Sequence, residues 1–180
     1  MSLPAPECER VAAHRRSITV QAYQRTDGLW DIEGHLADAW PTPVPKAGST
    51  LAPGQPMHSM WLRLTVDSSA TIVGATAAVA AGPYDEACAA IAPDYSKLIG
   101  VRVAGGYRSA VRQLLGRTAG CTHMNELAGV MGSAVLQAMW EVLTSDSDDK
   151  PFAVDGCHAL KASGPQVAKF FPKWFQPNEH

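Results

Sequence analysis

The spacing of the apolar residues changes near position 82, and this change constrains the fold more than any other feature of the sequence. Before that point apolar residues alternate with polar or small ones, which is the period of a β-strand. After it they recur at steps of three and four residues, which is the period of an amphipathic helix. Strands followed by helices predict an α+β fold, with an antiparallel sheet of about four strands and helices packed on one face.

Two predicted hairpins account for the strand half. Residues 17–25 and 29–40 alternate and are separated by Thr26-Asp27-Gly28, which is a turn signal. Residues 58–67 and 70–81 form the second pair of predicted strands. Five prolines and two glycines in the 16 residues 41–56 exclude a helix or a central strand there. This segment is therefore predicted to be a long loop, and it is long enough to act as a lid.

The helical half contains one dominant predicted helix. It follows Cys121, and its apolar positions Leu127, Val130, Met131, Ala134, Val135, Ala138, Met139 and Val142 fall on one stripe. Shorter helices are predicted over 84–92, 107–116 and 164–171. The polar, proline-containing residues 1–16 are predicted to be a flexible arm, and residues 17–176 a single α+β domain.

Composition excludes several classes of function. The formal net charge is −2, and lysine and arginine form no long cluster, which argues against nucleic-acid binding. No segment has the roughly 18–20 consecutive apolar residues that span a bilayer, so no membrane association is expected. The first residues lack the apolar centre of a signal peptide, which predicts a cytoplasmic protein. Its four cysteines are then expected to be thiols or metal ligands rather than disulfides.

Cys121 and His123 are the best candidates for chemistry. Residues two apart on a helix point about 200° away from each other, so both can face one ligand only if Cys121 precedes the helix. Thr122 is the predicted N-cap, and Glu126 follows His123 on the same face. A helix N-terminus also favours a cysteine thiolate. The alternative is a buried cysteine beside a hydrogen-bonded histidine.

Other cysteines and histidines offer weaker signals. Cys88 lies early in a predicted helix and His58 begins a predicted strand, facing the same side as Met60. Cys157 and His158 are adjacent in a turn-like setting. Taken alone, each of them is more typical of an ordinary structural role.

A second set lies on one predicted strand. Alternation places Asp31, Glu33 and His35 on one face, where two carboxylates and a histidine can bind a metal ion. The same pattern is typical of a solvated strand face.

The sequence resembles an uncharacterised bacterial family, the domain of unknown function 2889. The phrases "DGLWDIEGHLAD", "MHSMWLRLTVD", "APDYSKLIGVRV", "GCTHMNELAG" and "DGCHAL" carry this resemblance, which covers about residues 27–174. The resemblance implies no general activity.

A more distant resemblance covers residues 55 to about 140. "MWLRLTVDSSATIVGATAAV", "CAAIA" and "CTHMNELAG" are similar to the hairpin and the two cysteine-bearing helices of IscU/NifU-type iron–sulfur scaffolds. This resemblance implies an IscU/NifU-like core with an extra N-terminal hairpin. It would make Cys88 and Cys121 ligands and would place His58 near the scaffold's aspartate. Met57-His58 stands where the scaffold has its first cysteine, and Gly120 stands where it has the histidine that precedes its last cysteine. The resemblance therefore implies a mononuclear site rather than a cluster.

Three functions are compatible with these residues. The first is a metalloprotein, with zinc or iron held by His58, Cys88, Cys121 and His123, that acts on a small molecule. Here His123 and Glu126 serve catalysis, and Cys157 or His158 completes the site. The second is a metal-free thiol enzyme with Cys121 as nucleophile. The third is a non-enzymatic metal or iron–sulfur scaffold. The aromatic residues 170–177 predict packing against the body or a homo-oligomeric partner.

Overall fold

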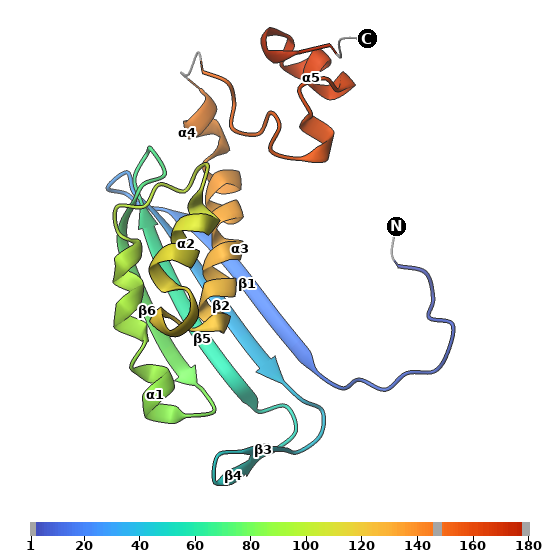
Figure 1. The fold of residues 1–180 in the computed structure, drawn as a ribbon, viewed down its shortest axis with the longest axis vertical. Coiled ribbons are helices and arrows are strands. Elements are labelled where there is room, and N and C mark those ends of the chain that lie inside the picture. Colours follow the sequence, from blue (N-terminus) through green and yellow to red (C-terminus); the bar gives the residue numbers. More distant parts are fainter. Residues whose placement is uncertain (1–2, 146–148, 178–180) are drawn as a thin grey trace.

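The sheet of the protein has four antiparallel strands. The computed structural model describes residues 3–145 and 149–177, and within these the strands lie in the order β1-β2-β5-β6. Their bounds are β1 Arg15–Gln24, β2 Trp30–Ala39, β5 Pro56–Val66 and β6 Ile72–Ala81. The predicted α+β fold is confirmed, and both predicted hairpins form. The long helix and its neighbours lie against one face of the sheet, as Figure 1 shows.

The helices follow the strands along the chain, as the change of period predicts. The α-helices are α1 Asp85–Ala89, α2 Tyr107–Leu115, α3 Thr122–Ala138, α4 Trp140–Thr144 and α5 Pro165–Phe170. Short 3₁₀ helices among the described residues are η1 Ala92–Leu98, η2 Arg117–Ala119, η3 His158–Leu160 and η4 Pro172–Trp174. Within the described ranges, none of these helices combines the length and the apolar character needed to cross a membrane.

The core lies between the sheet and α3. Alternate residues of β2 and β5 point to this side and are buried, among them Ile32, Leu36, Met60 and Leu62. Gly34 lies in the same row, and a Cβ there would stand 2.6 Å from the sulfur of Met131 on α3. The absence of a side chain at this position lets the long helix approach the middle of the sheet closely.

The opposite face of the sheet carries polar side chains together with the exposed aromatic residues Tyr23 and Trp61. Asp31, Glu33 and His35 do share this face, but each one has a partner of its own. Asp31 accepts a hydrogen bond from Thr65, Glu33 accepts one from Arg63, and His35 lies 3.0 Å from the Ser59 hydroxyl. The three side chains are therefore not brought together as a metal site, and the interpretation as a solvated strand face accounts for them.

The proline-rich segment 41–56 contains a small hairpin that the sequence does not predict. Its strands are β3 Val44–Lys46 and β4 Ser49–Leu51, and they pair only with each other. Gly48, with φ +72°, turns the chain between them. Among the described residues, this segment gives the main sheet only Pro56, the first residue of β5.

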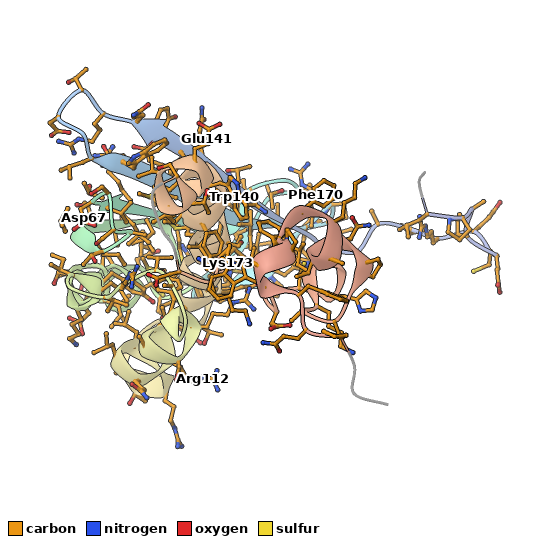
Figure 2. All side chains as sticks on the ribbon, turned by 90° about the horizontal axis from the view of Figure 1, so that it is seen from above. Asp67, Arg112, Trp140, Glu141, Phe170 and Lys173 are labelled. Carbon is orange, nitrogen blue, oxygen red and sulfur yellow. The ribbon has the colours of Figure 1, made fainter. Side chains whose placement is uncertain are left out.

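The C-terminal segment has a small core of its own. Val154, Ala162 and Val167 are buried there, with Phe171 and Trp174 packed around them. In Figures 1 and 2 this segment, with α5 and Phe170, stands beside the sheet and its helices rather than among them, and the N-terminal arm extends away from the body. The predicted division into an arm over 1–16 and one domain over 17–176 stays a prediction. The polar residues 144–151 are typical of a solvated loop in the sequence, and they lie partly outside the described residues.

Candidate metal centre

Asp38, His58 and His123 converge from three separate elements. Asp38 on β2 and His58 on β5 are direct cross-strand partners, and both belong to the row of residues that faces the helices. His123 comes from the first turn of α3, which begins over this end of the sheet (Figure 1). The meeting point is thus fixed by the strand register and by the start of one helix.

The three side chains form the one group in the described parts of the chain with the spacing of metal ligands. One ligand atom from each lies within 4.8 Å of those of the other two. The Asp38 Oδ2 atom is 3.1 Å from His58 Nδ1 and 3.9 Å from His123 Nε2. Ligands at the usual bond lengths around a tetrahedral zinc ion are about 3.3 Å apart. Small side-chain adjustments would therefore place all three atoms around one ion.

The carboxylate of Asp38 is buried and ionised. Its side chain is only 2% exposed, yet both of its oxygens accept hydrogen bonds of 2.8 Å from Arg16 on β1, in a bidentate arrangement. Burial alone would raise the pKa of Asp38, but the Arg16 hydrogen bonds and positive charge outweigh it, and the pKa lies below its usual range. His14 Nε2 also lies 3.3 Å from Oδ1. The site therefore contains a permanent negative charge.

The two histidines are held in the neutral form. Burial lowers the pKa of His58 and that of His123, and for both this outweighs the attraction of Asp38. Their rings stack with centroids 3.8 Å apart, and a positive charge on His58 further lowers the pKa of His123. Because a metal ion binds the unprotonated imidazole, both side chains are ready to act as ligands at neutral pH.

Cys121 lies directly beside this group, at the N-cap position of α3. Its extended backbone, with φ −102° and ψ 132°, places it before the helix, as the two-residue spacing requires. Thr122, the predicted N-cap, is instead the first helical residue. The Cys121 sulfur is 3.9 Å from His123 Nδ1. The prediction that Cys121 and His123 face one location is therefore confirmed.

Buried Tyr95 fixes the start of α3. Its hydroxyl accepts a hydrogen bond from the Cys121 N–H and donates towards Asn125 Oδ1, 2.8 Å away. Burial raises the pKa of Tyr95, so this hydroxyl keeps its proton. The Asn125 amide in turn donates to the Leu115 carbonyl at the end of α2. This chain of hydrogen bonds positions both Cys121 and His123.

The structure brings together only part of the predicted ligand set. His58 and His123 belong to the converging group, whereas Cys88 on α1 does not, and its side chain contacts Gly82 at the end of β6. Cys157 and His158 do not belong to the group either. They come after the C-terminal end of α3, whereas the group lies at the N-terminal end of this helix, which is about 25 Å long. Glu126 contacts the group only through Arg16, whose guanidinium donates to it.

Sequence reasoning missed Asp38, Arg16 and His14. One signal could have indicated Asp38, since it continues the alternating row of Ile32, Gly34 and Leu36 and so falls on the buried side of its strand. A charged side chain in such a row needs partners. Nothing in the sequence shows that those partners come from the start of β1 and the residue next to it, so the sequence alone does not indicate Arg16 or His14.

A scan against protein families matches residues 14–137 to a family described as proteins of unknown function, DUF2889. The matched region contains Asp38, His58 and His123. No curated protein and no solved structure matches the chain significantly, so the resemblance to IscU/NifU-type scaffolds is not confirmed. Because the match spans well over half of the sequence, the chain belongs to the DUF2889 family.

Proposed function

We propose that the protein binds a divalent metal ion, zinc or iron, through Asp38, His58 and His123, and that it uses this ion to act on a small molecule. The observation that carries the proposal is the convergence of one carboxylate and two imidazoles from three elements within 4.8 Å. This is the donor set of many zinc and non-haem iron sites, in which three protein ligands leave coordination positions open.

The protonation states of the two histidines are those that metal ligands need. A structural ion pair needs protonated histidines beside Asp38, but the lowered pKa values of His58 and His123 make them neutral. Each neutral ring has one unprotonated nitrogen, and the lone pair of this nitrogen can bind a cation beside the ionised carboxylate. Binding would require His58 Nδ1 to exchange its contact with Asp38 for the ion, and Arg16 would keep the carboxylate in place.

The positions left open would face solvent. The His123 side chain is 25% exposed and that of His58 14% exposed, so the site is reachable from outside while Asp38 stays buried. A bound divalent ion would supply a Lewis acid that polarises a substrate or activates water. Arg16 is a positioning residue in this proposal, because it holds Asp38 and partly balances its negative charge. Glu126 acts one step further out, since it accepts a hydrogen bond from Arg16.

A second candidate function rests on a different observation. The Cys121 sulfur lies at the start of the 17-residue helix α3 and 3.9 Å from His123 Nδ1. This arrangement supports a metal-free thiol enzyme in which His123 accepts the proton of Cys121 as the sulfur attacks. Iodoacetamide labelling of the metal-free protein separates the two functions. Fast labelling of Cys121 that the His123→Gln substitution slows would favour the thiol enzyme.

The metal content of the purified protein tests the main proposal. After anaerobic purification, elemental analysis is expected to find about one zinc or iron ion per chain. The Asp38→Asn variant is expected to lose most of it, because the amide carries no charge. Asp31→Asn is the matched control, since Asp31 lies on the same strand but faces the open side of the sheet. Equal metal content in the wild type and the Asp38→Asn variant would contradict the proposal.

A further inference from the structure

Two sulfur atoms lie next to the proposed metal centre, on the other side of the His123 ring. The Cys121 Sγ atom is 3.9 Å from the Met60 Sδ atom and also 3.9 Å from His123 Nδ1. We propose that Met60, Cys121 and His123 form a second metal site, which takes a soft monovalent ion, Cu(I).

The donor types favour this ion. A thioether is a poor ligand for zinc or for iron(II), whereas thiolate and thioether sulfur together select Cu(I). Imidazole is acceptable to it as well. A site with two sulfurs and one nitrogen therefore differs in chemical class from the neighbouring site, which has one oxygen and two nitrogens.

Charge balance favours a monovalent ion over a divalent one. The Met60 side chain is buried in the core at 1% exposure, and Cys121 packs against that core. A Cys121 thiolate and Cu(I) sum to zero, so no net charge is left in these apolar surroundings. A divalent ion with the same three ligands would leave a positive charge there, which is costly to bury.

The three donors are held by separate, well-supported elements. Met60 lies on β5 two residues after His58 and on the same face of the sheet, opposite Leu36 of β2. Cys121 is fixed by Tyr95 at the N-cap of α3. His123 directs Nδ1 towards Cys121 and Nε2 towards Asp38, 3.9 Å away. The second site thus shares only His123 with the proposed metal centre and does not depend on Asp38.

Anaerobic titration with Cu(I) in competition with the chromophoric chelator bicinchoninate tests this inference. The wild type is expected to withdraw about one Cu(I) per chain from the chelator. Cys121→Ser should abolish this withdrawal, and Met60→Leu should weaken Cu(I) binding by about tenfold or more. Met60→Leu nearly conserves volume, so the variant should stay folded, which its thermal melting curve checks.

Two control variants make the result specific. Cys88→Ser removes another partly buried thiol and should bind Cu(I) like the wild type. Asp38→Asn should also retain Cu(I), although it loses zinc. Copper-edge X-ray absorption of the Cu(I)-loaded wild type should show two sulfur neighbours, and this measurement needs no variant.

Several results would overturn the inference. The first is that Met60→Leu and Cys121→Ser bind Cu(I) as tightly as the wild type. The second is that the wild type withdraws no Cu(I) from the chelator. The third is a copper-edge spectrum of the Cu(I)-loaded wild type that shows at most one sulfur neighbour. None of these results bears on the zinc measurement with Asp38→Asn. Conversely, loss of Cu(I) in the sulfur variants with no zinc effect of Asp38→Asn would support the second site and contradict the proposed function.

Discussion

Asp38 is the residue on which the proposed centre depends most. Its buried carboxylate lies within 4 Å of Arg16, His14, His58 and His123, and of these side chains only Arg16 carries a permanent positive charge. The bidentate hydrogen bonds from Arg16 therefore provide most of the compensation for burying Asp38. Because Arg16 supplies this positive charge, His58 and His123 can remain neutral.

Replacing Arg16 by glutamine should therefore destabilise the protein. Asp38 would lose two charge-assisted hydrogen bonds while remaining buried, and we expect the free energy of unfolding to fall by about 2 kcal/mol. Urea denaturation of the metal-free protein measures this change. Arg15→Gln is the control, because Arg15 is the exposed neighbour on the same strand and should have little effect. Equal stability of the two variants would show that Asp38 does not need Arg16.

At the scale of elements, α3 determines where the site forms. The helix lies over the sheet at Gly34 and against α2 at Gly132, where a Cβ would stand 2.5 Å from the ring of Tyr107. That ring cannot easily move, because it is buried and its hydroxyl donates to the Ala128 carbonyl. Two glycine contacts thus set the position of α3, and with it the position of His123.

Two glycine-to-alanine substitutions on α3 test this packing. Gly132→Ala should lower the free energy of unfolding by about 1–3 kcal/mol, because the new methyl group overpacks the contact with Tyr107. Gly129→Ala is the matched control on the same helix. No atom would lie within 4 Å of its Cβ, so the substitution should stabilise the helix by about 0.5–1 kcal/mol. Changes of the same sign in both variants would contradict the packing described here.

The predictable part of the molecule is the part that local pattern determines. Alternation predicts the four main strands, and the spacing of Cys121 and His123 predicts that the cysteine precedes α3. The sequence indicates His58 and His123 as candidate ligands. It does not show that they meet Asp38, because this depends on the strand register that pairs Asp38 with His58 and on the docking of α3. The resemblance to IscU/NifU-type scaffolds predicts Cys88 as a ligand. The carboxylate ligand, Asp38, lies on β2, which is outside the region of that resemblance.

At the scale of the whole molecule, the histidines should make stability depend on pH. In the metal-free protein burial lowers the pKa of His58, His123 and His35 below the ordinary value of 6.5. Below pH 6.5 the unfolded chain therefore binds protons that the folded protein does not, and stability falls as the pH decreases. Well above pH 6.5 these residues make no contribution to the slope, because they are neutral in both states.

Denaturation midpoints measured from pH 8 to pH 5 should therefore be level at first and then decline. The double variant His58→Asn, His123→Gln should show a shallower decline, with only His35 remaining of the three. Asp38 does not titrate between pH 8 and pH 5, because its pKa is lowered from 3.8 and the carboxylate stays ionised throughout this range. An equally steep decline in the double variant would contradict the assignment.

The separate core of the C-terminal segment leads to a prediction about truncation. Its buried residues Val154, Ala162 and Val167 belong to a cluster distinct from the main core, and the family match ends at residue 137. A chain that ends at Ser145 should therefore keep its cooperative melting transition and its zinc affinity. Loss of zinc binding in a truncated chain that remains folded would show that the C-terminal segment takes part in the site.

The most direct test of the metal centre is a crystal structure of the protein grown with zinc, with diffraction data collected on both sides of the zinc absorption edge. We predict an anomalous peak at bonding distance, about 2.0–2.2 Å, from Asp38, His58 and His123 together. Arg16 should still hold the carboxylate in that structure. An anomalous peak on other ligands, or no peak between these three side chains at saturating zinc, would contradict the account.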